Sequence, residues 1–139
     1  MAIETSPTIS SADPFFQGRR FPGRTRFGGG TPIAAGDVAL SAGFGTTASV
    51  AVTAGSTDTR GEITVTSAGT GQAANPTATL TFKDGAYAAA PTPYVRRNGG
   101  SQATVAISVS ATTTALTLTF RGTPVAAETY VIGWACDPA

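Results

Sequence analysis

Residues 77–83 read TATLTFK, and the pattern of this stretch decides the fold class. Apolar and polar side chains alternate along it without a break, with Ala78, Leu80 and Phe82 set against Thr79, Thr81 and Lys83. In an extended strand, successive side chains point to opposite faces. The stretch is therefore predicted to be a strand with one buried face and one face in solvent.

The same period of two recurs along most of the chain. It is found in SVAVT (49–53), EITVTS (62–67), TVAISVS (104–110), LTLTF (116–120) and YVIGW (130–134), and more weakly in YVRR (94–97). Glycine, proline, asparagine and serine gather between these stretches, as is typical of turns. About seven short strands of this kind predict an all-β fold, an antiparallel two-sheet β-sandwich of jelly-roll-like type, over residues 41–139.

Composition indicates that this sandwich associates with copies of itself. Charged residues make up 12% of the chain, against about 25% in an average protein. Few predicted inward side chains are large, the main ones being Phe82, Phe120 and Trp134. A small core with a weakly charged surface is marginal alone, so we expect a homo-oligomer.

Residues 1–40 show neither a strand period nor a helix period, and we interpret them as an extended arm. Proline and glycine are spread through them at a density that prevents helices and central strands. The stretch FFQGRRFPGRTRFGGG (15–30) has no acidic residue. It carries four phenylalanines and four arginines, namely Phe15, Phe16, Phe21, Phe27, Arg19, Arg20, Arg24 and Arg26.

These arm residues are the candidate partner-binding residues. Burying a phenylalanine contributes roughly 1.5–3 kcal/mol, so the rings are expected to dock on another surface. Three surfaces are possible: the protein's own sandwich, a nucleic acid, or a different protein subunit. The net charge of +1 disfavours nucleic acid. A protein partner bound by an arm that orders on contact is the favoured interpretation.

No pattern of catalytic or metal-binding residues stands out, and we expect no enzymatic activity, no cofactor and no metal. Histidine is absent from the chain, which excludes catalysis by Ser-His-Asp or Cys-His. Cys136 is interpreted as a half-buried thiol without a catalytic role. The remaining candidates for a paired-carboxylate site show no spacing that brings them together: Asp58, Glu62, Asp84 and Glu128.

Two loops carry charges that could contact a partner. The stretch DTRG (58–61) is interpreted as a turn closed by a contact between Asp58 and Arg60, with a binding motif as the alternative. The stretch RRNGG (96–100) is interpreted as a basic hairpin tip in solvent. Contact of Arg96 and Arg97 with an acidic neighbour is its alternative.

The N-terminus has neither the basic start nor the apolar run of a signal peptide. No stretch approaches the roughly 20 apolar residues of a membrane span. We therefore expect a soluble protein that is made in the cytoplasm and does not enter a membrane.

Residues 43–134 resemble a β domain that recurs in structural proteins of tailed bacteriophages. The matching motifs are Gly43-Phe44-Gly45, Asp58-Thr59-Arg60-Gly61, Leu80-Thr81-Phe82, Tyr130 and Trp134. The resemblance implies a virion protein, made in the host bacterial cytoplasm and commonly trimeric. A short arm in place of a fibre shaft favours a decoration protein on the capsid, anchored to another virion protein, the major capsid protein being favoured. The alternative is a receptor-binding or tip module of a tail fibre or baseplate that recognises the host cell surface.

Overall fold

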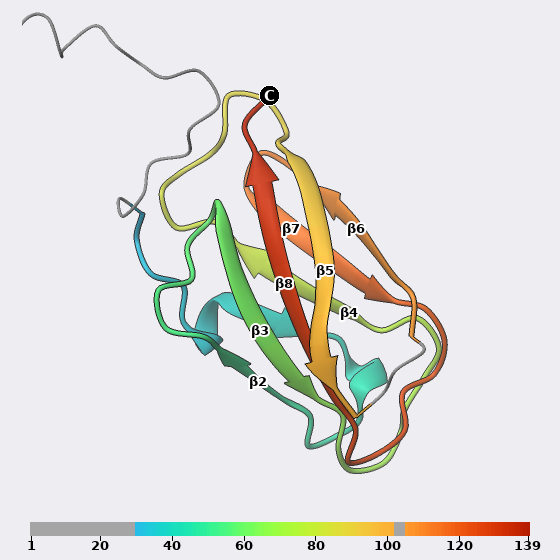
Figure 1. The fold of residues 1–139 in the computed structure, drawn as a ribbon. Coiled ribbons are helices and arrows are strands. Elements are labelled where there is room, and N and C mark those ends of the chain that lie inside the picture. The colour runs from blue at the N-terminus through green and yellow to red at the C-terminus, as the bar shows by residue number, and fades with distance from the viewer. Residues whose placement is uncertain (1–29, 102–104) are drawn as a thin grey trace, which may run out of the picture.

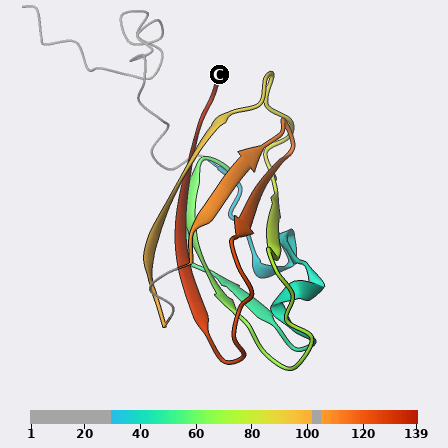
Figure 2. The same cartoon turned by 90° about the vertical axis from the view of Figure 1, so that its right-hand side faces the viewer.

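A computed structural model describes residues 30–101 and 105–139 of the chain. In these residues the strands form two four-stranded antiparallel sheets that pack face to face (Figure 1, Figure 2). The strand orders are β1-β4-β7-β6 and β2-β3-β8-β5. The elements are η1 Ala35–Asp37, β1 Val38–Leu40, η2 Ala42–Phe44, β2 Ser49–Val52, β3 Arg60–Thr66, β4 Thr77–Thr81, β5 Thr92–Gly100, β6 Ile107–Ala111, β7 Ala115–Phe120 and β8 Thr129–Asp137. The prediction of an all-β two-sheet sandwich is confirmed.

The alternating pattern produces these strands as expected. The apolar positions of β3, β4 and β7 are buried, whereas the threonines between them are only partly covered or exposed. On the outer face of the first sheet, the hydroxyls of Thr79 and Thr117 lie 3.4 Å apart on neighbouring strands. Each strand therefore places its apolar face in the core between the sheets and its threonine face outside.

The core contains more large side chains than the sequence indicated. Phe44 and Tyr130 are fully buried and flank Phe120, with ring centroids 4.9 Å and 5.3 Å from it in edge-to-face geometry. Phe44 comes from η2, outside any strand, and Tyr130 begins the inward face of β8. Such aromatic pairs contribute about 0.5–1.5 kcal/mol beyond the area they bury.

The sandwich begins before residue 40. Ile33 is buried in the core, and β1 pairs with β4 in the register Val38↔Leu80. Residues 33–40 are therefore part of the folded body, although the sequence analysis assigned them to the arm. The short β1 escaped detection because three residues are too few to show a period. The phenylalanine and arginine positions of the arm, residues 15–27, lie outside the described residues.

The described chain starts and finishes at one end of the sandwich, which we call the near end. The amide of Ile33 donates to the carbonyl of Ser56, and the amide of Cys136 donates to the carbonyl of Thr59, so both meet the loop between β2 and β3. The loops 67–76 and 121–128 meet at the opposite, far end, where the amide of Asn75 donates to the carbonyl of Gly122 (Figure 1).

The prediction of a hairpin tip at residues 96–100 is wrong. These residues lie inside β5, where Arg96 pairs with Gly133 and Arg97 with Ile132 of β8. The register shifts between Arg97 and Gly99, so the turn-like Asn-Gly sequence forms a β-bulge. β5 ends only at Gly100, whose φ of 107° suits glycine. The local propensity of residues 96–100 favours a turn. They remain in a strand because β8 is long enough to pair with them.

Within the described residues, no helix is long and apolar enough to span a membrane.

Candidate functional site

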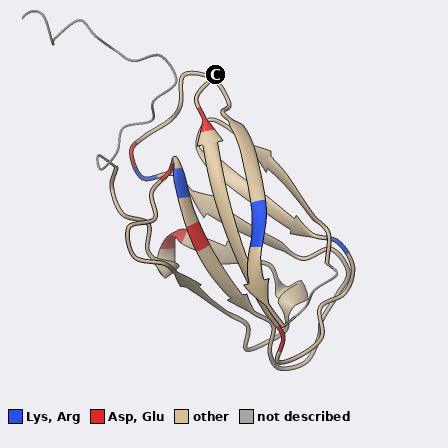
Figure 3. Cartoon of the chain, in the orientation of Figure 1, with Lys and Arg blue, Asp and Glu red and all other residues tan. Residues whose placement is uncertain are grey.

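A depression of about 510 Å³ lies on the outer face of the β2-β3-β8-β5 sheet, toward the near end. The outward side chains of β3 and β5 that line it alternate with inward ones such as Ile63 and Val65. Most of the charges on this sheet lie along the same two strands (Figure 3). The lining residues on which the site depends are Arg60, Glu62, Tyr94, Arg96, Asn98 and Gly133.

Strand register explains why the surface is hollow at this point. Gly133 of β8 pairs with Glu62 on one side and with Arg96 on the other. Two residues further along β8, Ala135 pairs with Arg60 and with Tyr94 in the same way. The central strand thus presents small side chains between two strands that carry long ones, and the long side chains form the walls.

Glu62 is held in place by two hydrogen bonds from opposite sides. The hydroxyl of Thr53 donates to its Oε1 over 3.1 Å, and the side-chain amide of Asn98 donates to its Oε2 over 2.5 Å. The second bond passes over Gly133, where a Cβ would lie 2.7 Å from Asn98 Nδ2. Glycine at this position therefore allows the polar bridge between β3 and β5.

Tyr94 and Arg96 are the exposed groups of the depression. The Tyr94 side chain is 56% exposed, one of two large hydrophobic residues in the described chain that reach this degree of exposure. Arg96 is also exposed, and within residues 30–101 and 105–139 its side chain has no hydrogen bond or ion pair. Because β5 is an edge strand of the sheet, both side chains can meet a ligand.

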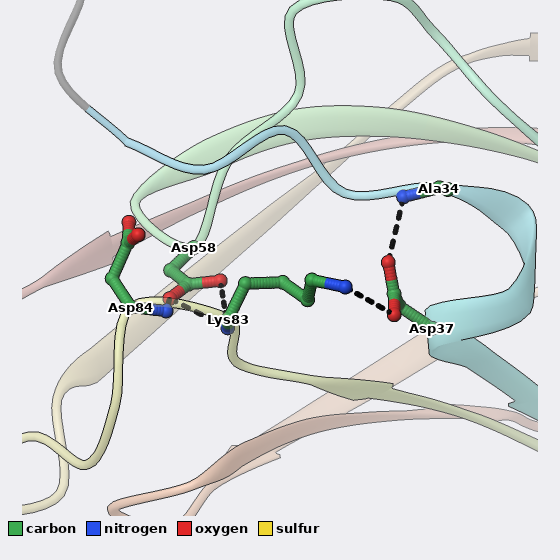
Figure 4. Close-up of polar contacts among 5 residues, drawn as sticks. All are labelled: Ala34, Asp37, Asp58, Lys83 and Asp84. Atoms are coloured by element: carbon green, nitrogen blue, oxygen red, sulfur yellow. Dashed lines mark hydrogen bonds and ion pairs between the residues drawn. The ribbon is translucent and has the colours of Figure 1, made fainter.

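Asp58 lies at the near end and is only 3% exposed, which does not fit the alternative of a surface binding motif at residues 58–61. Its carboxylate accepts the backbone amide of Lys83 at 2.8 and 2.9 Å, and that of Asp84 at 2.7 Å (Figure 4). The buried charge is satisfied by these donors. Asp58 therefore joins the β2–β3 loop to the β4–β5 loop.

A second set of contacts holds the first described residues onto this end. Asp84 accepts the amide of Thr31 at 2.9 and 3.1 Å. The Thr31 side chain, followed by this amide, lowers the pKa of Asp84 below its ordinary value of 3.8. Asp37 accepts the amide of Ala34 and pairs with Lys83 Nζ at 2.9 Å (Figure 4). The Ala34 amide, followed by Lys83, lowers the pKa of Asp37 as well.

The other two predicted contact residues, Arg97 and Arg60, lie in different environments. Arg97 is partly buried, its Nε donates to the carbonyl of Gly99 at 3.4 Å, and its Nη2 is buried. It is therefore not the solvated tip that was predicted. Arg60, at the start of β3, lies in the wall of the depression together with Arg96.

Sequence reasoning missed the depression itself. A signal was present in β5, because Tyr94, Arg96 and Asn98 are spaced by two and so share one face. That signal was hidden by the turn-like residues that follow. The matching positions on β3 and β8 could not be found from the sequence, because strand register alone brings them together.

Among the remaining candidates for chemistry, Asp58 and Asp84 are neighbours at the near end, where the Asp84 amide donates to the Asp58 carboxylate. Cys136 is buried, and burial raises the pKa of its thiol to about 11. The carboxylates of Asp58, Glu62 and Asp84 bind three different sets of donors. In the part of the chain that the structure describes, no group of three or more histidine, cysteine, aspartate or glutamate side chains is arranged to hold a metal ion.

No protein-family model, no curated protein and no solved structure matches this chain.

Proposed function

We propose that this protein is a non-enzymatic structural protein of a tailed-phage virion, and specifically a decoration subunit on the capsid surface. In this proposal residues 15–27 bind another virion protein, the major capsid protein being the favoured partner, and the sandwich projects outward. The observation that carries the proposal is the position of Thr31. It follows the phenylalanine- and arginine-rich segment directly and is bound to Asp84 at one end of the sandwich.

The near-end contacts suit the attachment of a rigid body to an anchor. Asp84 binds the amide of Thr31, the carbonyl of Ser56 binds the amide of Ile33, and Asp37 pairs with Lys83, so this segment is attached to the rest of the sandwich at three points. A segment fastened in this way transmits the orientation of the anchor to the sandwich. The loops at the far end lie opposite the end of the sandwich that binds Thr31 (Figure 1).

The non-enzymatic part of the proposal is supported by the use of the carboxylates. Asp58 accepts backbone amides, and Glu62 accepts Thr53 and Asn98. Each therefore has a structural role in the sandwich, which supports a non-enzymatic function.

The oligomeric part of the proposal is that the subunit forms a trimer, as the phage resemblance implies. The low charge of the sequence supports self-association. Sedimentation equilibrium of the full chain at micromolar concentration tests it, and three protomers per particle are expected. A monomer under these conditions contradicts it.

The decisive experiment for anchoring is co-sedimentation with phage particles that lack this protein. The full chain is expected to bind, whereas a chain that starts at Gly30 is expected to remain in the supernatant. Circular dichroism of the shortened chain serves as the folding control. If the shortened chain binds as well as the full chain, the anchor proposal fails.

A second candidate function is a receptor-binding module at the tail, and the exposed depression with Tyr94 and Arg96 favours it. The two candidates differ in copy number. A decoration protein is present in hundreds of copies per virion, and a tail module in a handful. Quantitative mass spectrometry of purified virions separates them.

A further inference from the structure

We infer that the depression on the outer face of the β2-β3-β8-β5 sheet is a binding site for an anionic saccharide. This inference goes beyond the proposed anchoring, because it concerns the face of the sandwich and not the arm. It also does not require that anchoring to be correct. Its basis is the combination, in one hollow, of an exposed aromatic ring, an arginine whose side chain has no partner among the described residues, and a prearranged pair of hydrogen-bonding groups.

The hollow has the size and composition of a small-ligand site. Its volume of about 510 Å³ falls within the roughly 300–1,000 Å³ of known small-molecule sites. Such sites combine apolar surface with a few polar groups that fix the orientation of the ligand. Here Tyr94 supplies the apolar surface, and the polar groups come from Glu62, Arg96 and Asn98.

Tyr94 is suited to contact a sugar ring. It pairs with Ala135 across β5 and β8, so a small side chain lies beside the ring and leaves its surroundings open. A pyranose ring presents a face of C–H groups, and the negative face of an aromatic ring attracts their partial positive charge. The 56% exposure of Tyr94 leaves room for such a contact.

The charge of the hollow favours an anionic ligand over a neutral one. Its charged lining residues are Arg60, Arg96 and Glu62, which leaves an excess of one positive charge. Glu62 is further engaged by Thr53 and Asn98, whereas the side chain of Arg96 has no partner in the described chain. A guanidinium matches a carboxylate or a phosphate with two parallel hydrogen bonds.

The distances along β5 allow one ligand to meet both groups. Tyr94 and Arg96 are two residues apart on the same face, and that spacing is roughly 6.5–7 Å in a strand. This is about the width of a substituted sugar ring, so a ring that packs on Tyr94 can present its carboxylate or phosphate to Arg96.

The bridge between Asn98 and Glu62 prearranges the polar part of the site. Both side chains are held before any ligand arrives, and the glycine beneath them leaves the backbone of β8 close by. Groups that are already ordered lose less freedom on binding. The hydroxyls of a sugar can donate to the remaining lone pairs of Glu62 and accept from the amide of Asn98.

The experiment is an NMR titration of the full-length, isotope-labelled protein with glucuronate at millimolar concentration. We expect amide shifts at Tyr94, Arg96, Gly133 and Ala135. Glucose is the neutral control, and acetate is the charged control that lacks a sugar ring. Glucose 1-phosphate carries a phosphate in place of the carboxylate. Both charged sugars are expected to bind more tightly than glucose and than acetate.

Two variants test the assigned groups. Arg96→Gln is expected to weaken binding of glucuronate by roughly tenfold or more, because it removes a charge-assisted hydrogen bond. Tyr94→Ala is expected to weaken the binding of glucuronate but to leave the binding of acetate unchanged. Arg121→Gln is the matched control, since this exposed arginine lies in the far-end loop 121–128. It should bind as the natural chain does.

Four results would overturn the inference. They are an absence of shifts in the depression, equal binding of glucose and glucuronate, equal binding of acetate and glucuronate, and unchanged binding by Arg96→Gln. A lower oligomer mass of Tyr94→Ala in sedimentation would also overturn it, because the hollow would then be an interface between copies. None of these results bears on particle binding by the arm.

Discussion

The side-chain amide of Asn98 on β5 donates a hydrogen bond to the carboxylate of Glu62 on β3, across the strand β8 that separates them. The bond is possible because residue 133 on β8 is glycine. A Cβ at this position would lie 2.7 Å from Asn98 Nδ2 and 3.3 Å from Arg96 Nε. One absent methyl group therefore determines how the walls of the depression are arranged.

The first prediction concerns this glycine. Gly133→Ala is expected to push Asn98 off Glu62 and to lower the free energy of unfolding by about 0.5–1.5 kcal/mol, the usual contribution of one hydrogen bond. Urea denaturation measures this change. Gly99→Ala is the matched control, because its Cβ would meet only Val131 at 3.9 Å, an ordinary contact. Equal destabilisation by both substitutions would show that the bridge is not the cause.

The second prediction concerns the buried carboxylate at the near end. Asp58→Ala leaves the amides of Lys83 and Asp84 without their acceptor. A hydrogen bond to a charged group contributes about 1.5–3 kcal/mol, and these bonds are partly buried, so the free energy of unfolding is expected to fall by about that amount in urea denaturation. Asp137→Ala, at the exposed end of β8, should change it by less than about 0.5 kcal/mol. A neutral Asp58→Ala would contradict the assigned role.

The third prediction concerns acid. The Thr31 hydrogen bonds lower the pKa of Asp84 below 3.8 in the folded state. Stabilisation by such a group is complete above its pKa in the unfolded chain, and it is lost as the pH falls through the lower pKa of the folded state. Asp84→Asn should therefore be less stable than the natural chain at neutral pH, and the difference should shrink as the pH falls below 3.8.

Urea denaturation at a series of pH values measures this difference. Asp137→Asn is the control, and its free energy of unfolding should stay close to that of the natural chain at every pH. A difference for Asp84→Asn that is constant down to the most acidic pH would show that the Thr31 contact does not stabilise the charged carboxylate.

The fourth prediction concerns Cys136. Its thiol is buried and its pKa is raised to about 11, so little thiolate is present at pH 8. Ellman's reagent is expected to react with the folded protein at least a hundredfold more slowly than with the protein in guanidinium, roughly the thiolate ratio that a shift of two pKa units implies. Rapid reaction of the folded protein would place the thiol at the surface.

The fifth prediction ranks the two kinds of arm residue. Burial of a phenylalanine contributes roughly 1.5–3 kcal/mol, whereas an exposed ion pair contributes about 0–1 kcal/mol. Replacement of the four arm phenylalanines by alanine is therefore expected to abolish co-sedimentation with particles. Replacement of the four arm arginines by glutamine should weaken it less and make the remaining binding less sensitive to salt. The ranking is wrong if the variant without the four arginines does not bind particles while the variant without the four phenylalanines binds normally.

The sequence by itself determined the class of the fold. The alternation in residues 77–83 and 116–120 specifies strands with one apolar face, and several such strands must bury those faces against each other. The positions of Leu80, Leu116 and Phe120 in the core followed directly from that period, and the structure confirms them. These features could be predicted because they depend only on neighbours along the chain.

Only the tertiary structure decided what the polar residues do. Asp58 looks like a loop charge in the sequence, and it becomes a buried acceptor only because the β4–β5 loop folds over it. Residues 96–100 look like a turn, and the length of β8 makes them a strand. The depression exists because register places Gly133 between Glu62 and Arg96. Such long-range pairings are set by the packing of the whole sandwich, and no local pattern of residues encodes them.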